Sequence, residues 1–134
     1  MNEIIFLEFE DIIEIHDIAL KKYGGSPGIR DVNLLLSAIY QPQQTFEGKF
    51  LYDSISKMAA IYAYHIAENQ PFIDGNKRTA FAASVVFLKL NGYKLSATNE
   101  EVYQLFIDLA NKKLLKEEFV KWYDERTSVS TNGK

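Results

Sequence analysis

The stretch NQPFIDGNKRTA, residues 69–80, places an acid, a glycine, an amide and two adjacent cations between two apolar segments. The segment before it carries an apolar stripe at helical spacing, and this helix is expected to end near Asn69 because Gln70 precedes a proline. The segment after it is apolar on nearly every side until Asn91 and Gly92, so we expect this second helix at the centre of a bundle. The stretch therefore predicts two core helices joined by a polar turn.

Four further helices are expected around this pair, from apolar residues at helical spacing and from capping or stop signals. They are residues 9–23, 32–40, 98–110 and 115–126, with signals at Gly24, Asp31 and the capping-box pair Thr98 and Glu101. Asp53 is the expected N-cap of the helix before the stretch, and residues 41–52 are expected to form a long surface loop. The prediction is an all-α, compact bundle of about six helices in one domain, residues 1–126. No convincing strand pair appears, and residues 127–134 have nothing to bury and are expected to be a disordered tail.

The composition excludes several classes of protein. The chain has 134 residues, 47% of them hydrophobic, with a net charge of −3 and no cysteine. This charge disfavours direct binding of nucleic acid or of an anionic membrane, and the missing cysteine excludes disulfides, a thiol nucleophile and Cys-ligated metals. No stretch reaches the roughly 18 to 20 apolar residues of a membrane span, and the acidic first residues do not resemble a signal peptide. We therefore expect a cytoplasmic protein.

Lys77 and Arg78 lie where a helix begins, although a helix already carries partial positive charge at that end. Each exposed cation at that end destabilises the helix by about 0.3 to 1 kcal/mol, and a bound anion reverses the sign of this electrostatic contribution. A turn at Gly75 that leads into a helix N-terminus also presents N–H groups that commonly hold phosphate, and Asp74 could hold Mg²⁺ that bridges phosphate oxygens. These residues predict a nucleotide-phosphate site. An ordinary turn, with Asn76 as the cap and solvated cations, is the alternative.

The same stretch resembles the signature of the Fic/Doc family, whose pattern runs His-x-Phe-x-Asp/Glu-Gly/Ala-Asn-Lys/Gly-Arg. The lysine after the asparagine is typical of the Doc branch. Two blocks are also similar to Doc-like toxins, GGSPGIRDVNLLLSAIYQPQQTF and AAIYAYHIAENQPFIDGNKRTAFAASVVFLKLNGYKL, so that the resemblance covers residues 9–125. It implies an all-helical transferase of a toxin–antitoxin module that uses ATP and Mg²⁺ to phosphorylate a threonine of translation elongation factor Tu, and so inhibits translation.

The resemblance also implies roles for individual residues. Phe72 anchors the loop, Asp74 positions Mg²⁺, Gly75 and Asn76 form the anion nest, and Lys77 and Arg78 neutralise the phosphates of ATP. It further implies a cognate antitoxin with a disordered segment that folds along the toxin near the motif. We expect loops 26–31 and 41–52 either to line the edge of the nucleotide pocket or contact the protein target, or to be ordinary surface structure. Two other functions stay open, an AMP-transferring Fic-type enzyme and a non-catalytic module that binds antitoxin or nucleotide.

The chain departs from the pattern at Gln70, where the family has histidine. The resemblance implies that this histidine is the general base, and an amide has no basic nitrogen to take its place. Loss of a positioned base typically costs about 10² to 10⁴ in rate, so we expect impaired transfer and a surviving nucleotide pocket. His65 and His16 lie beside apolar stripes, and both are expected to be packed rather than to replace the base. Gln70 fits a natural inactive relative or a deliberate substitution.

Overall fold

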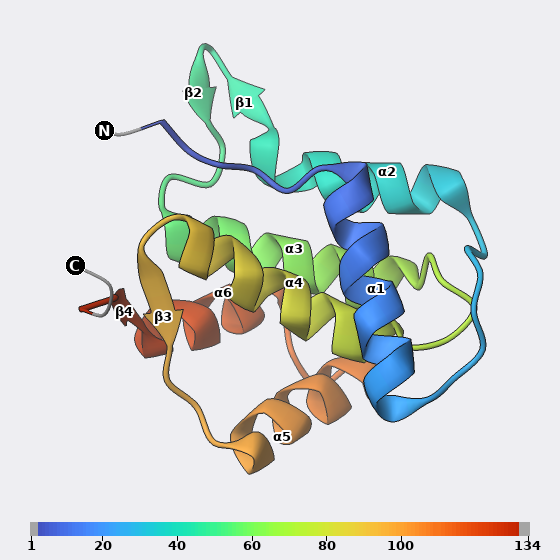
Figure 1. Ribbon diagram of the computed structural model, residues 1–134. Coiled ribbons are helices and arrows are strands. Elements are labelled where there is room, and N and C mark those ends of the chain that lie inside the picture. The colour runs from blue at the N-terminus through green and yellow to red at the C-terminus, as the bar shows by residue number, and fades with distance from the viewer. Residues whose placement is uncertain (1–2, 132–134) are drawn as a thin grey trace.

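The computed structural model describes residues 3–131, and this part of the chain folds into six α-helices with two small strand pairs (Figure 1). The helices are α1 Phe9–Tyr23, α2 Val32–Tyr40, α3 Ile55–Asn69, α4 Asn76–Leu90, α5 Asn99–Ala110 and α6 Lys116–Arg126. A 3-10 turn, Gln41–Gln43, follows α2, and the strands are β1 Thr45–Phe46, β2 Lys49–Phe50, β3 Tyr93–Leu95 and β4 Thr127–Val129. The predicted all-α bundle is confirmed.

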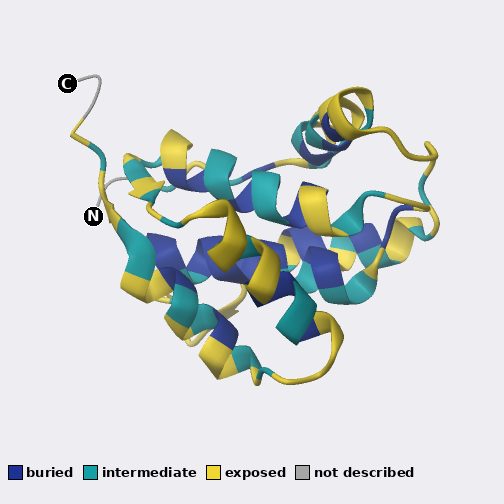
Figure 2. Ribbon diagram, turned by 90° about the horizontal axis from the view of Figure 1, so that it is seen from below, coloured by how far each residue is buried: buried dark blue, intermediate teal, exposed yellow. Residues whose placement is uncertain are grey.

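Helix α3 lies at the centre of this bundle and packs against α2, α4 and α6. Ten of its 15 residues are buried, against six of 15 in α4. The prediction that placed α4 at the centre is therefore wrong, because Phe81 and Val85 leave one side of α4 only partly covered. Figure 2 shows the buried residues on the helix faces that meet in the interior. Small side chains such as Ala63 and Ala83 are fully buried and allow close helix packing.

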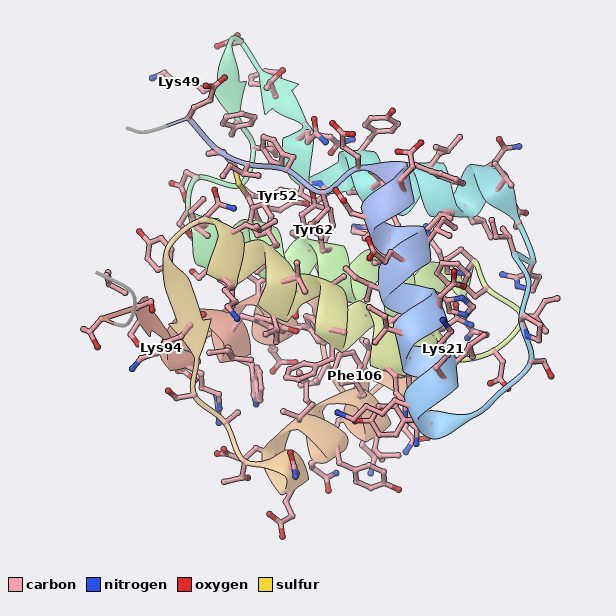
Figure 3. All side chains as sticks on the ribbon, viewed as in Figure 1. Lys21, Lys49, Tyr52, Tyr62, Lys94 and Phe106 are labelled. Carbon is pink, nitrogen blue, oxygen red and sulfur yellow. The ribbon has the colours of Figure 1, made fainter. Side chains whose placement is uncertain are left out.

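Buried hydroxyl groups fix both ends of the chain to the central helices, and one of them belongs to Tyr62 in α3 (Figure 3). Its side chain is fully buried, and its hydroxyl oxygen accepts a hydrogen bond of 3.0 Å from the backbone N–H of Leu7. Near the C-terminal end of the chain, the hydroxyl groups of Ser84 in α4 and Tyr123 in α6 lie 2.7 Å apart. Burial raises the pKa of both tyrosine hydroxyls, so both stay neutral. These buried hydroxyl groups thus have partners, and through them the N-terminal segment and α6 are fixed to the bundle.

Most of the predicted helix caps are confirmed. Asp31 accepts a hydrogen bond from a backbone N–H of α2, and Thr98 forms the predicted capping box with α5. The prediction of Asp53 as the cap of α3 is wrong, since Ser54 holds that position and accepts from Lys57 N. Asp53 instead forms a surface ion pair of 2.9 Å with Lys57 Nζ. Serine and aspartate cap helices about equally well, so only the backbone geometry decides between two neighbours.

The two strand pairs were not predicted. Strands β1 and β2 form a short hairpin within residues 41–52, and β3 pairs with β4 in the register Tyr93↔Val129 and Leu95↔Thr127. The predicted disorder from residue 127 is therefore wrong for β4, and residues 132–134 lie outside the described part. Val129 is 63% exposed, so β4 gains little from side-chain burial. Backbone hydrogen bonds hold it, and a count of apolar side chains does not reveal them.

Two connections meet at one end of the bundle and frame the site. The turn between α3 and α4 and the loop between α1 and α2 lie side by side in Figure 1, and an antiparallel bridge pairs Ile29 with Phe72. Within residues 3–131, no helix is long and apolar enough to cross a membrane.

Candidate functional site

The turn between α3 and α4 reverses the chain through two residues in the left-handed region. Gln70 caps the C-terminus of α3 with φ 47° and ψ 57°, and Gly75 is the N-cap of α4 with φ 75° and ψ 20°. Such angles suit glycine, but they strain a residue with a side chain. A Cβ on Gly75 would also lie 3.4 Å from the side chain of Leu20. The start of α4 therefore depends on glycine at this position.

Phe72 anchors the turn, as the resemblance implied, and it does so against a histidine. Its ring is 1% exposed and stacks on the ring of His16 at a centroid distance of 3.8 Å and an interplanar angle of 7°. His16 Nε2 lies 2.8 Å from the carbonyl oxygen of Asp74. A carbonyl can only accept, so Nε2 carries the proton and donates it. His16 is packed, as predicted, and it also holds the motif from α1.

Asn76 closes the turn with its side chain instead of capping the helix. Its Oδ1 accepts from Phe72 N at 2.9 Å, and its Nδ2 donates to Phe72 O at 2.9 Å. The alternative in which Asn76 is the N-cap is wrong, because Gly75 holds that position. The backbone N–H groups of Asn76, Lys77 and Arg78 form the first turn of α4, where no intrahelical acceptor exists. These three donors face outward at the positive end of the helix.

Asp74 presents an ionised carboxylate beside these donors. Its Oδ2 accepts from Ser26 N at 3.1 Å, and its Oδ1 accepts from Gly75 N at 2.9 Å. These two hydrogen bonds, from Ser26 first and Gly75 second, lower the pKa of Asp74, and the nearby charge of Arg78 adds to them. In the described part of the chain, no three acidic or histidine residues gather around a metal position. A single carboxylate fits Mg²⁺ when phosphates supply further oxygens.

The two motif cations are exposed, and one of them is ordered by a residue that the sequence did not single out. The guanidinium carbon of Arg78 lies 4.3 Å from the ring centroid of Tyr23 at the end of α1, and Lys22 Nζ lies 5.4 Å from the same centroid. Stacking uses the face of the guanidinium and leaves N–H groups at its edge for an anion. Lys77 lies in the same first turn. Three cations thus surround the start of α4.

The loop between α1 and α2 borders the motif, which is one of the two expectations for residues 26–31. Pro71 O accepts from Arg30 N at 2.6 Å and from Asp31 N at 3.0 Å, and Ile73 N donates to Gly28 O at 3.0 Å. Gly28 has φ 116°, which favours glycine, and a Cβ there would also lie 2.8 Å from Ile73 Cδ1, so that this side chain would have to move. The predicted loop at residues 41–52 is instead the turn and β1–β2 hairpin described above.

Neither histidine is free to serve as the general base that the resemblance implies. His16 is committed to the carbonyl of Asp74. His65 Nε2 is buried without a hydrogen-bond partner among residues 3–131, and burial, with a smaller effect of Lys116, lowers the pKa of His65 to about 4. His65 is therefore packed and neutral, as predicted. Gln70 itself is exposed at the turn.

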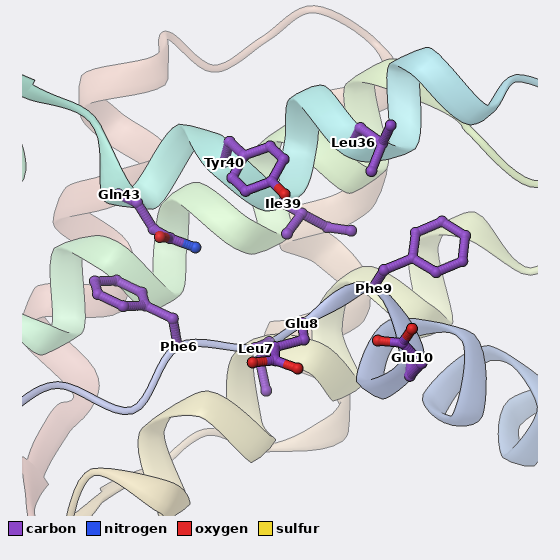
Figure 4. Close-up of a pocket in the computed structure, with 9 residues that line it drawn as sticks. All are labelled: Phe6, Leu7, Glu8, Phe9, Glu10, Leu36, Ile39, Tyr40 and Gln43. Atoms are coloured by element: carbon purple, nitrogen blue, oxygen red, sulfur yellow. The ribbon is translucent and has the colours of Figure 1, made fainter.

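A cavity of about 510 Å³ lies elsewhere, between the N-terminal segment and α2 (Figure 4). Its lining combines aromatic and aliphatic side chains with two glutamates, and comprises Phe6, Leu7, Glu8, Phe9, Glu10, Leu36, Ile39, Tyr40 and Gln43. No residue of the motif belongs to this lining. The exposed motif residues Asp74, Lys77 and Arg78 thus lie apart from this cavity.

Comparisons with known proteins agree with this arrangement. A family model described as "Fic/DOC family" matches residues 6–88, which include the whole α3–α4 turn. "Toxin Doc" of Mycolicibacterium smegmatis (strain ATCC 700084 / mc(2)155) is 39% identical over 92 residues, which cover 69% of this chain and 68% of the relative. "Protein kinase doc" of Escherichia phage P1 is 32% identical over 89 residues, which cover 64% of this chain and 68% of the relative. The chain therefore belongs to the Fic/Doc family.

Proposed function

We propose that this protein is a Doc-type toxin of the cytoplasm, an ATP- and Mg²⁺-dependent kinase that phosphorylates a threonine of elongation factor Tu and so inhibits translation. The observation that carries the proposal is the start of α4, where free N–H groups, Lys77 and Arg78 converge beside the ionised Asp74. Phosphoryl transfer needs mainly positioning and charge stabilisation, and these residues supply both. The names of the two relatives, a toxin and a protein kinase, support the same class.

Each residue of the site has a defined task in this proposal. The first-turn N–H groups of α4 and the cations Lys77 and Arg78 bind the phosphate oxygens of ATP. Asp74 holds Mg²⁺, which when bound neutralises charge between the phosphates. The side chain of Asn76 keeps Phe72 and the turn in place, so that the donors of the first turn point at one position. Binding of ATP thus requires no histidine at residue 70.

Gln70 limits the reaction at the proton transfer. The attacking hydroxyl must lose its proton, and the amide of Gln70 can accept a hydrogen bond without taking that proton away. The two histidines of the chain are both held elsewhere, His16 by Asp74 and His65 by its buried position. We therefore infer that the chain binds ATP and transfers its phosphoryl group slowly.

The test compares the chain with its Gln70→His variant, supplied with elongation factor Tu and with ATP labelled at the γ or the α position. We expect γ label on a threonine of the factor, appearing about 10²- to 10⁴-fold faster after Gln70→His. Lys77→Ala in the Gln70→His background is the control that should lose this activity again, because it removes a proposed phosphate contact and leaves the new base. Label from the α position would establish AMP transfer instead. No label from either position would overturn the enzyme proposal for this target.

A non-catalytic module is the second candidate, and the combination of Gln70 with an otherwise complete motif favours it. Such a module would bind the cognate antitoxin, or a nucleotide, without turnover. Toxicity in growing cells separates the two candidates. A Gln70→His chain that stays harmless while it still binds ATP and antitoxin would favour the non-catalytic module. A Gln70→His chain that arrests growth, and does so only without antitoxin, would favour the toxin.

A further inference from the structure

Gln70 adopts a backbone conformation that its own sequence disfavours. It lies in the left-handed region with φ 47°, although it carries a side chain and precedes Pro71. L-residues with a Cβ are strained in this region, and a following proline restricts the backbone further. The contacts of neighbouring elements must therefore hold residue 70 in place.

Arg30, in the loop between α1 and α2, makes these contacts. Its Nε donates to Gln70 O at 2.7 Å, and its Nη2 donates to Asn69 O at 2.7 Å. Its backbone N–H donates to Pro71 O at 2.6 Å. A single residue thus binds three consecutive carbonyl groups across the strained position. The guanidinium also lies at the C-terminus of α3, where carbonyls lack helical partners and carry partial negative charge.

The other hydrogen bonds at this turn do not replace Arg30. Gln70 N donates to Ile66 O, which ends the helix in the ordinary way, and Asn69 Nδ2 donates to Leu34 O. Both bonds fix the chain before residue 70, and the bonds from Asp31 N to Pro71 O and from Ile73 N to Gly28 O fix it after residue 70. Among residues 3–131, Arg30 alone binds the carbonyls on both sides of the Gln70 φ and ψ angles with charge-assisted hydrogen bonds.

We propose that Arg30 is the positioning residue for position 70: it fixes the left-handed backbone there and so sets the direction in which the side chain at position 70 points. This inference rests on the proposed function for its catalytic meaning, because position 70 is where the family pattern has its base. Arg30 acts through the backbone and not on substrate. In an active Gln70→His enzyme, it determines whether the imidazole reaches the attacking hydroxyl.

The first test is a thermal-unfolding cycle that uses glycine, which adopts positive φ without strain. We expect Arg30→Ala to lower the Tm by roughly 5 °C in the parent chain. In the Gln70→Gly background the same change should lower the Tm by less than half as much. Arg126→Ala is the matched control, because Arg126 also donates to a backbone carbonyl, Trp122 O, on a helix remote from the turn, and its effect should be equal in both backgrounds. Equal losses for Arg30→Ala in both backgrounds would overturn the proposal.

The second test uses kinetics in the Gln70→His background. Arg30→Ala should lower kcat for phosphoryl transfer roughly 10- to 100-fold, since misplacement of about 1 Å can cost that much, and should leave KM for ATP within about twofold. Arg30→Lys should recover only part of the loss, because lysine lacks the planar fork that binds two carbonyls. A raised KM with unchanged kcat would contradict the positioning role. If Gln70→His transfers no phosphoryl group at all, the proposed function fails, and the thermal cycle still decides the role of Arg30.

Discussion

The N-termini of α4 and α5 are built in opposite ways. At α5, Thr98 accepts from Glu101 N at 3.1 Å, Glu101 accepts from Thr98 N at 2.8 Å, and the first turn is acidic. At α4, Gly75 offers no side-chain cap, and the first turn carries Lys77 and Arg78. At the start of α5, the capping box thus supplies acceptors for backbone N–H groups, and the acidic first turn offsets the positive end of the helix dipole. The start of α4 has neither a side-chain cap nor an acidic residue in its first turn.

The comparison shows what replaces a cap when a helix start is kept free for binding. Three side chains hold the turn before α4: His16 and Arg30 reach it from distant parts of the chain, on the carbonyl of Asp74 and on the end of α3, and Asn76 binds the backbone of Phe72 within the turn itself. These contacts fix the turn from its inner side and leave its outer side open. The stability that α5 obtains locally comes, at α4, from tertiary structure.

The largest effect is expected from a substitution that removes one of these contacts to the turn before α4. Asn76→Ala removes two hydrogen bonds of 2.9 Å to Phe72 and should lower the free energy of unfolding by about 2 kcal/mol. Asn99 is the matched control, since it is the first residue of α5 and is exposed. Asn99→Ala should change the stability by less than about 0.5 kcal/mol. Urea denaturation measures both, and equal losses would show that Asn76 has no special role.

A smaller effect is expected from the cap of α5. Thr98→Ala leaves the N–H of Glu101 without its acceptor and should lower the free energy of unfolding by about 1 kcal/mol. Inorganic phosphate in the denaturation buffer should not change this loss, because the α5 cap needs no anion. A loss that phosphate reverses would mean that the α5 start also binds anions, which would remove the contrast with α4.

Charge substitutions at the two helix starts should act with opposite signs. Lys77→Gln removes an opposed charge and should raise the free energy of unfolding by about 0.3 to 1 kcal/mol without ligand, whereas Glu100→Gln should lower it by a similar amount. With ATP present, Lys77→Gln should lose part of the stabilisation that the parent chain gains from the ligand. Denaturation with and without ATP measures this, and an unchanged gain would exclude Lys77 from the site.

The smallest effect concerns the carboxylates beside the two starts. Hydrogen bonds from backbone N–H groups, of Ser26 and Gly75 for Asp74 and of Thr98 for Glu101, lower both pKa values. Because the folded pKa is depressed, each group stabilises the protein above its ordinary pKa, near 4, and this contribution disappears as the pH falls through the folded value. NMR titration should show both shifts. Added phosphate should raise the pKa of Asp74 alone, and a similar rise at Glu101 would contradict the assignment of the site.

The local part of the fold could be predicted because its signals are local. Glycines, N-cap residues and helical spacing lie within a few residues of the structures that they specify, so the helix bounds were found closely, for example Phe9–Tyr23 and Asn99–Ala110. The error at Asp53 arose where two neighbours had equal capping ability. The pairing of β3 with β4 was missed because it joins distant residues, such as Tyr93 and Val129, through backbone groups that are the same in every sequence.

The candidate site also has a part that the sequence could predict and a part that it could not. The motif residues proposed to bind phosphate are contiguous in sequence, so their types alone suggested a phosphate site at Gly75 to Arg78. The residues that hold the motif are distant, with His16 58 positions from Asp74 and Arg30 40 positions from Gln70. Tyr23 under Arg78 belongs to this second group. No spacing rule links such pairs.

The sequence by itself determined which chemistry this protein can offer: a glycine turn, an acid and two cations at a helix start, with an amide at residue 70. These are properties of residue type and of helix geometry, and they act over one or two turns. Only the tertiary structure decided how that chemistry is held, through His16, Asn76 and Arg30. The reason is physical: a left-handed backbone at Gln70 and an uncapped α4 are unfavourable locally, and only contacts that the whole bundle brings together can offset them.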